Sequence, residues 1–186
     1  MPTWDSIKSR VYPYLKARIA GDVAAGLFSM EWIDELNLSV YFVIEENDVV
    51  LNHVSKAQLI EWNVSKEVFI NTAIANLMSH PNTENLGSLK AGNNVVAVLY
   101  DNGDDYDATR ILCKRARIIA CSALQSDSCY AAIPNKNLLI FNRDINPTLI
   151  KLTEDNFKSE KQKLTKEFLH IAKNGDIINY KEKFWF

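Results

Sequence analysis

The spacing of apolar and polar positions predicts several strands before any other feature is considered. Residues 38–44, Leu-Ser-Val-Tyr-Phe-Val-Ile, are mostly β-branched and aromatic, which favours a strand. Residues 49–51 are all apolar and predict a second strand, which returns after a polar turn at residues 45–48. Residues 94–100 form a nearly continuous apolar run, as a central strand does. The pattern therefore predicts a sheet that starts near residue 38 and includes the middle of the chain.

Two helix starts follow the first pair of strands. Ser55 and Gln58 have the spacing of a capping box, in which each side chain accepts a hydrogen bond from the backbone of the other residue. Ser65 opens the next helix, and Pro81 ends it because proline disfavours a helical conformation in the residue before it. This second helix carries a buried stripe at helical spacing: Ile70, Ile74 and Leu77.

Helical spacing also occurs in two other parts of the chain. Near the N-terminus it predicts a short amphipathic helix, although Pro13 weakens that prediction; the apolar positions are Ile7, Val11, Tyr14 and Leu15. A further helix is predicted to begin near Tyr106, with this core stripe: Ala108, Leu112, Ala116, Ile119 and Ala123.

The last third of the chain predicts a hairpin, a helix and one ambiguous segment. Residues 129–133 and 138–141 are apolar and flank a polar turn, which indicates a β-hairpin. Asn146-Pro147 is a helix start with proline at the first helical position. Farther on, Asn174-Gly175 either closes a second hairpin or ends a helix that runs through residue 173. We favour the hairpin, because apolar and β-branched residues flank the turn on both sides.

Together these elements predict one α+β domain over residues 1–186. Its sheet is expected to be mixed or mostly antiparallel, with about five strands and with helices packed on one face. Residues 1–35 would form an N-terminal helical segment, residues 38–145 the core, and residues 146–186 a helix and a hairpin. No repeat, low-complexity tract or linker interrupts the 186 residues, which suits a single domain.

Composition and charge exclude several classes of function. The net charge is −2 and the pI is about 5.9, so the chain lacks the basic surface of a nucleic-acid-binding protein. No apolar run is long enough to span a membrane, and no secretory signal is recognisable. The three cysteines have no Cys-x-x-Cys spacing and are expected to be reduced and mostly buried, which points to the cytoplasm.

Motifs for catalysis or for a cofactor are missing from the sequence. There is no phosphate-binding or dinucleotide-binding glycine pattern and no Gly-x-Ser-x-Gly motif. The three histidines, His53, His80 and His170, do not have the spacing of a zinc-binding helix. We therefore expect no cofactor, no metal and no catalytic set, and an enzymatic activity is the less favoured interpretation.

The most unusual feature is an acidic loop that follows the predicted strand at residues 94–100. Four carboxylates fall within seven residues: Asp101, Asp104, Asp105 and Asp107. Three hypotheses are open. The aspartates cap the next helix, or bind a hard cation such as Mg²⁺ or Ca²⁺, or present negative charge to a basic partner protein. Tyr106 and Arg110 share one helix face, and Arg110 could pair with Asp107 or anchor an anionic group.

The same loop carries a resemblance to a known family. Residues 105–112 read Asp-Tyr-Asp-Ala-Thr-Arg-Ile-Leu. Together with residues 38–77 and 132–140, they resemble the YtpQ-like family of bacterial proteins, whose motif is Gly-Tyr-Asp-Ala-Ser-Arg-Ile-Leu. Asp105 departs from the family's glycine, and the N-terminal region is shorter than the family's. The resemblance implies a shared fold over residues 38–145 and a role for the loop, but no reaction, because the family has no assigned activity.

These observations favour a non-enzymatic protein-interaction module. In its concrete form this would be a bacterial immunity protein that neutralises a toxin by pressing an acidic surface onto a basic active site. The expected partner-binding residues are Asp101, Asp104, Asp105, Tyr106, Asp107 and Arg110. One alternative is a hydrolase or phosphotransfer enzyme that holds a divalent cation with the carboxylates of residues 101–107. Another is a housekeeping protein of unknown function.

Overall fold

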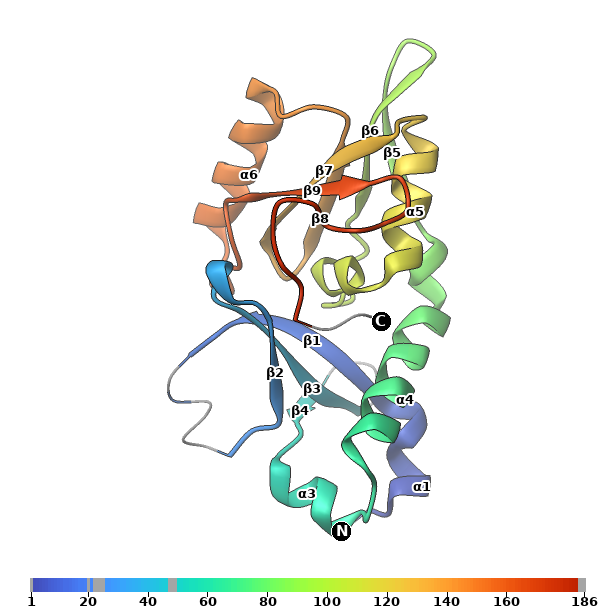
Figure 1. The fold of residues 1–186 in the computed structure, drawn as a ribbon, viewed down its shortest axis with the longest axis vertical. Helices are drawn as coiled ribbons and strands as arrows, with labels where there is room; N and C mark the ends of the chain where they lie inside the picture. Colours follow the sequence, from blue (N-terminus) through green and yellow to red (C-terminus); the bar gives the residue numbers. More distant parts are fainter. Residues whose placement is uncertain (1, 20, 22–25, 47–49, 184–186) are drawn as a thin grey trace. The chain divides into compact units, whose positions relative to one another are not determined.

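The computed structural model describes residues 2–19, 21, 26–46 and 50–183. The chain divides into two compact units, residues 1–80 (unit 1) and residues 81–185 (unit 2), and each contains an antiparallel sheet with helices (Figure 1). The α+β class is therefore confirmed. That the whole chain behaves as one domain stays a prediction, because a domain is defined by cooperative unfolding as well as by contacts.

Unit 1 is built around a long central strand. Its elements are α1 (Trp4–Ile7), β1 (Val11–Ala17), β2 (Ser29–Ile33), β3 (Leu38–Glu46), β4 (Val50–His53), α3 (Lys56–Glu61) and α4 (Lys66–Ser79), with short 3-10 helices at Lys8–Arg10 and Asp34–Leu36. The sheet order is β1-β3-β2, and β4 also pairs with β3. The expected strand at residues 38–44 is therefore the centre of this sheet. The turn expected at residues 45–48 lies partly outside the described residues.

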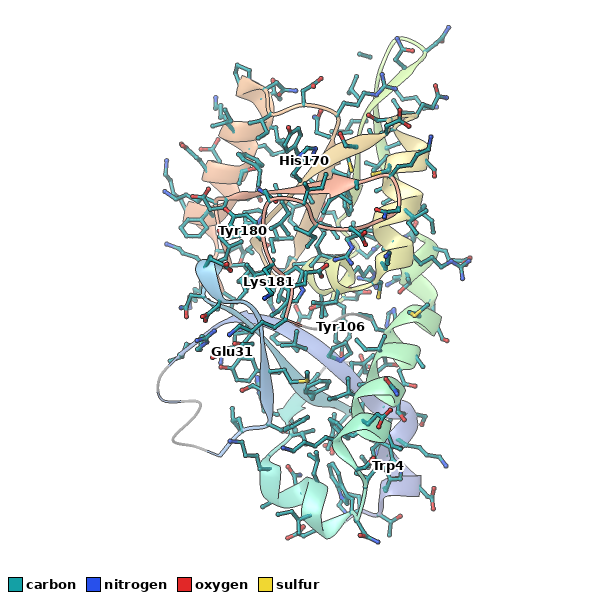
Figure 2. All side chains as sticks on the ribbon, in the orientation of Figure 1. Trp4, Glu31, Tyr106, His170, Tyr180 and Lys181 are labelled. Carbon is teal, nitrogen blue, oxygen red and sulfur yellow. The ribbon has the colours of Figure 1, made fainter. Side chains whose placement is uncertain are left out.

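An aromatic cluster fills the space between this sheet and the helices of unit 1. Phe42 of β3 and Phe69 of α4 are fully buried, with ring centroids 5.2 Å apart. Phe28 stacks on Phe42 at 5.2 Å, and Trp4 of α1 (Figure 2) lies 5.6 Å from Phe69. Both α1 and α4 therefore meet the face of the sheet that carries Phe42, as the prediction of helices on one face requires.

The predicted helix near the N-terminus is mostly a strand. Residues 4–10 are helical, but Val11–Ala17 pairs with the whole stretch Leu38–Ile44 in an antiparallel register. Pro13 cannot donate a backbone hydrogen bond inside a helix, but it is tolerated at the edge of a sheet, where β1 lies. The expectation of a helical segment over residues 1–35 is therefore wrong for residues 11–17 and 29–33, which form β1 and β2.

Both helix starts of unit 1 are confirmed. Ser55 accepts from the backbone N–H of Gln58, and the Gln58 side chain accepts from the backbone of Ser55, so that the capping box is complete. Ser65 accepts from the N–H of Val68 at the start of α4, which ends at Ser79, two residues before Pro81.

Unit 2 contains a second antiparallel sheet, of five strands, so the expectation that residues 38–44 and 94–100 share one sheet is wrong. Its elements are β5 (Gly87–Ala91), β6 (Asn94–Tyr100), α5 (Lys114–Ala123), β7 (Ser128–Asn135), β8 (Leu138–Asn142), α6 (Pro147–Ser159) and β9 (Phe168–Ala172), with 3-10 helices at Pro81–Glu84 and Ala108–Leu112. The strand order is β5-β6-β8-β7-β9, and all pairs are antiparallel. The hairpin β7–β8 and the start of α6 at Asn146-Pro147 are confirmed.

Helices cover both faces of this second sheet, whereas the sequence analysis placed them on one. α6 contributes Leu149 to a core cluster with Ala97, Ala132, Leu138 and Ile140. α5 contributes Cys121, which contacts Cys129. Cys129 precedes Ala132 by three residues, so the two side chains point to opposite faces. α5 and α6 therefore pack on opposite faces of one sheet.

Two predictions about the segments next to this sheet have opposite outcomes. The helix expected from Tyr106 is broken: a 3-10 helix ends at Leu112, Cys113 is extended, and α5 begins at Lys114. The hairpin at Asn174-Gly175 is confirmed, since Gly175 has a φ of +85° and its N–H donates to the carbonyl of Ala172. The returning segment makes only an isolated bridge between Ile171 and Ile177.

Within the described residues, no helix combines the length and the apolar character that crossing a membrane requires.

Candidate functional site

The acidic loop, residues 101–107, connects β6 to the 3-10 helix Ala108–Leu112. One of its aspartates, Asp107, binds backbone N–H groups of the loop itself. The Asp107 carboxylate accepts from the backbone N–H groups of Asn102 and Gly103 at 2.9 and 3.0 Å, and from the Asn102 side-chain amide at 3.0 Å. Asp107 occupies the N-cap position of the 3-10 helix but accepts no capping bond from it. The hypothesis that the aspartates cap the next helix is therefore wrong for Asp107, because the backbone groups that it binds belong to the loop.

A buried arginine joins the two inward-facing aspartates. Arg110 donates to both oxygens of Asp104, at 2.5 and 2.9 Å, and to Asp107 at 3.2 Å. The side chains of Arg110 and Asp107 are 0% exposed, and that of Asp104 is 13% exposed. The guanidinium also lies over the ring of Tyr100, 5.5 Å from its centroid. The expected pair of Arg110 with Asp107 is confirmed, and Asp104 is its second and closer partner.

Burial and charge act in opposite directions on these two carboxylates. Burial alone would raise the pKa of Asp104, but the hydrogen bonds and charge of Arg110 outweigh it, so the pKa lies below the ordinary value of 3.8. Burial raises the pKa of Asp107; the backbone N–H groups of the loop oppose this rise, and the charge of Asp104 adds to it. Asp104 is therefore the aspartate that holds its charge, and the guanidinium, most firmly as the pH falls.

Asp105 is held by a different part of unit 2. Its carboxylate forms an ion pair with Lys136, at the turn between β7 and β8. Its φ is +64°, a left-handed conformation that glycine adopts most easily and that aspartate tolerates better than most residues. The position at which the YtpQ-like motif has glycine is thus one whose backbone favours glycine. Asp101 is exposed, and Tyr106 is fully buried.

The loop therefore presents less negative charge than the sequence analysis expected. Tyr106, Asp107 and Arg110 are 0% exposed and cannot touch a partner in this structure, because their side chains lie beneath the surface. Asp104 is largely covered as well. Only Asp101 and Asp105 are left as accessible members of the expected partner-binding set. Partner binding by those two stays a prediction.

The same contacts bear on the hypothesis of a cation site. The carboxylates of Asp104 and Asp107 already share a positive charge, that of Arg110. Within the described residues, no three histidine, cysteine or acidic side chains gather where they could hold a metal ion. The contacts of Asp104 and Asp107 tie the end of β6 to the start of the next helix.

A second surface, which the sequence analysis missed, lies at the edge of the same sheet. β5 and β6 form a hairpin whose residues 87–94 are all exposed, and Figure 1 shows its tip extending past the ends of the other strands of unit 2. Gly92, at the turn, has a φ of +61°, as the first central residue of a type II′ turn requires. The Gly-Asn pair at the turn was the available signal, but the polar composition of β5 hid the strand before it.

The outer edge of β5, residues 87–91, pairs with none of the described strands. β5 is the last strand in the sheet order, and no described backbone segment bonds to its outer side. Leu89 is 50% exposed on this strand, and Val96 of β6 is also exposed. Lys90 is the only charged residue of β5. We refer to residues 87–91 as the open edge.

The opposite edge of the sheet, β9, is covered by the chain that follows it. The N–H of Ile178 donates to the carbonyl of His170, which is labelled in Figure 2. The side chain of Asn179 then makes two bonds to this edge, accepting from the N–H of His170 at 2.8 Å and donating to the carbonyl of Phe168 at 2.9 Å. The two edges of one sheet thus differ: β9 is closed by its own chain, and β5 is open.

Comparison of the chain with models of protein families, with curated proteins and with solved structures finds no match. Membership of the YtpQ-like family therefore stays a prediction.

Proposed function

We propose that this protein is a non-enzymatic interaction module, and that its partner is another protein which adds an extended segment to the open edge of β5. The observation that supports this proposal is a strand whose residues are all exposed, which carries the exposed Leu89 and whose outer edge pairs with no described segment. Exposed strand edges bind extended peptides through backbone hydrogen bonds, and pockets or patches for alternate side chains supply the specificity.

The residues of the open edge indicate the chemistry of the partner segment. Leu89 and Val96 offer apolar surface, so the segment carries apolar side chains at alternate positions. Lys90 favours an acidic residue opposite it, because unlike charges on adjacent strands stabilise a pair. The partner segment is therefore extended, apolar on one face, and acidic near its centre.

The immunity-protein hypothesis remains the narrower form of this proposal. A toxin bound at the open edge would contact the same unit that carries the exposed Asp101 and the half-buried Asp105. The structure gives this hypothesis less support than the sequence did, because Asp104 and Asp107 point inward. The cation-dependent enzyme is not favoured by any contact in the loop.

A matched pair of variants tests the proposal. Leu89→Glu places a negative charge on the open edge, and Ile178→Glu makes the same change at the covered edge, where the side chain is 57% exposed. A partner is captured from the source cell with the wild-type protein, purified, and titrated against all three forms by calorimetry. We expect Leu89→Glu to weaken binding by roughly tenfold or more, and Ile178→Glu to leave it unchanged.

Two results would contradict this proposal. A partner that binds both variants equally well would place the interface elsewhere. A wild-type protein that is a dimer in sedimentation, and that Leu89→Glu converts to a monomer, would make a second copy the occupant of the edge. A separate measurement addresses the enzyme alternative: a Mg²⁺-dependent rise in melting temperature that Asp104→Asn abolishes would favour it.

A further inference from the structure

Two of the three cysteines lie in direct contact, although eight residues separate them in the sequence. Cys121 is near the end of α5 and Cys129 is near the start of β7. Their Sγ atoms are 3.0 Å apart and both residues are buried. A disulfide requires the two sulfur atoms to approach only about 1 Å closer than this, so the fold already brings the thiols almost to bonding distance.

A surface cavity leads to one of these thiols. It has a volume of about 320 Å³ and is lined by Cys121, Ser122, Gln125, Ser126, Asp127 and Lys173. Apart from the cysteine, every lining residue is polar or charged. Asp127 and Lys173 form an exposed ion pair at 2.7 Å. Cys121 lines this cavity but is 0% exposed, so an oxidant reaches its sulfur when the cavity wall opens slightly, whereas Cys129 does not line the cavity.

The contacts of the two thiols also assign them different roles. The hydrogen bond between the sulfur atoms lowers the pKa of Cys121, while burial opposes that effect. The same hydrogen bond, together with burial, raises the pKa of Cys129. Because the thiolate is the form that reacts with oxidants, Cys121 is the first of the two to react.

We propose that Cys121 and Cys129 form an oxidisable dithiol that a hydroperoxide converts into an intramolecular disulfide. In the first step the Cys121 thiolate attacks the peroxide: an S–O bond forms, the O–O bond breaks, and the leaving oxygen takes a proton to give an alcohol or water. In the second step Cys129 loses its proton and attacks the sulfur of Cys121. The S–S bond forms, the S–O bond breaks, and water leaves. The two thiols are oxidised and the peroxide is reduced.

The third cysteine provides an internal control. Cys113 lies in the extended residue between the 3-10 helix and α5, and no contact joins it to another thiol. Burial raises its pKa to about 12, against the opposing charges of two arginines. Cys113 is therefore expected to stay reduced under conditions that oxidise the pair.

Tryptic digestion separates the pair from the control. Cleavage after Arg117 and Lys136 releases residues 118–136, which contain both Cys121 and Cys129, while Cys113 falls in residues 111–114. The intact protein is exposed to hydrogen peroxide, its remaining thiols are alkylated in denaturant, and the peptides are weighed. We expect residues 118–136 to be lighter than the reduced peptide by two hydrogen atoms and to carry no alkyl group. Residues 111–114 are expected to be alkylated, and dithiothreitol should reverse the mass change.

Variants test the order of the two steps. Cys129→Ser is expected to stop at the sulfenic acid of Cys121, which dimedone traps, and Cys113→Ser is expected to behave like the wild type. The proposal is overturned if residues 118–136 of the peroxide-treated wild type carry two alkyl groups. It is also overturned if Cys121 proceeds to the sulfinic acid, or if the disulfide joins two chains. Because the wild-type peptide masses decide these outcomes, the proposal remains testable even if Cys129→Ser does not fold.

Discussion

Replacing Arg110 tests whether the acidic loop is an internal ion-pair network. Arg110→Met keeps a long unbranched side chain but removes the guanidinium that Asp104 and Asp107 share. The side chains of Arg110 and Asp107 are 0% exposed, so in the variant water cannot solvate the Asp107 carboxylate unless the loop opens. Removing one partner of a buried ion pair costs about 3–5 kcal/mol. For a chain of this length that loss lowers the melting temperature by roughly 6–20 °C.

The assay is urea unfolding at pH 7, followed by far-ultraviolet circular dichroism. Arg115→Met is the matched control, because the Arg115 side chain is 68% exposed and its pairing with Glu84 is long, at 3.6 Å. An exposed pair contributes little, and we expect this control to change the free energy of unfolding by less than about 0.5 kcal/mol.

A double variant separates the ion pair from general packing. Asp104→Asn removes the charge that Arg110→Met leaves behind, so the two changes together should cost less than the sum of the single changes, by about 0.5–3 kcal/mol. Equal losses for Arg110→Met and Arg115→Met would refute the reasoning. The aspartates would then not depend on Arg110, and the outward-facing acidic surface would again be the better interpretation.

Three further predictions concern stability and are measured by the same unfolding assay. The pKa of Asp104 in the folded state is below the ordinary 3.8, so as the pH falls the unfolded chain binds a proton at this residue before the folded chain does. The free energy of unfolding should therefore decrease as the pH drops through 3.8 and below, and Asp104→Asn should reduce this dependence on pH. The raised pKa of Asp107 gives the opposite slope just above 3.8, and this slope should persist in that variant. Gly92→Ala should cost about 1 kcal/mol, because the residue at this position has a positive φ. Gly175→Ala should cost about 1–3 kcal/mol more than that, because a Cβ there would lie 2.9 Å from a carbonyl oxygen at the start of α5. Equal costs for the two variants would refute this reasoning. Ser55→Ala should cost about 1 kcal/mol by removing the capping box, and a neutral result would show that α3 is held by packing alone.

Features that depend on neighbouring residues were predictable from the sequence. Asn94–Tyr100 is a strand with the predicted bounds, and both serine caps form the expected bonds. These signals are local, because a cap or an apolar run acts within a few residues of itself. The N-terminal prediction failed for the complementary reason. Val11–Ala17 is too short for its period to separate a helix from a strand, and the choice was made by pairing with β3, which lies more than twenty residues away.

The candidate sites required information that spacing does not contain. Four clustered aspartates indicate negative charge, but not whether their side chains point inward or outward. That orientation depends on Arg110, which lies in the 3-10 helix and donates back to Asp104 in the loop. Cys121 and Cys129 match no motif, since a helix end and a strand start bring them together only in the fold. The open edge was missed because a solvated strand has almost no apolar pattern to detect.

The two edges of the unit 2 sheet give the interaction proposal its physical basis. An unpaired strand edge is a liability, because it can pair with other chains without selection. At β9 this chain removes the liability with one turn and the side chain of Asn179, which accepts from one backbone group of the strand's outer edge and donates to another. A short segment is therefore sufficient to close an edge in this fold. No described segment does so at β5, where Lys90 is the only charged residue that discourages unselected pairing. This difference between the two opposite edges is the physical basis of the proposal that another protein supplies a strand at β5.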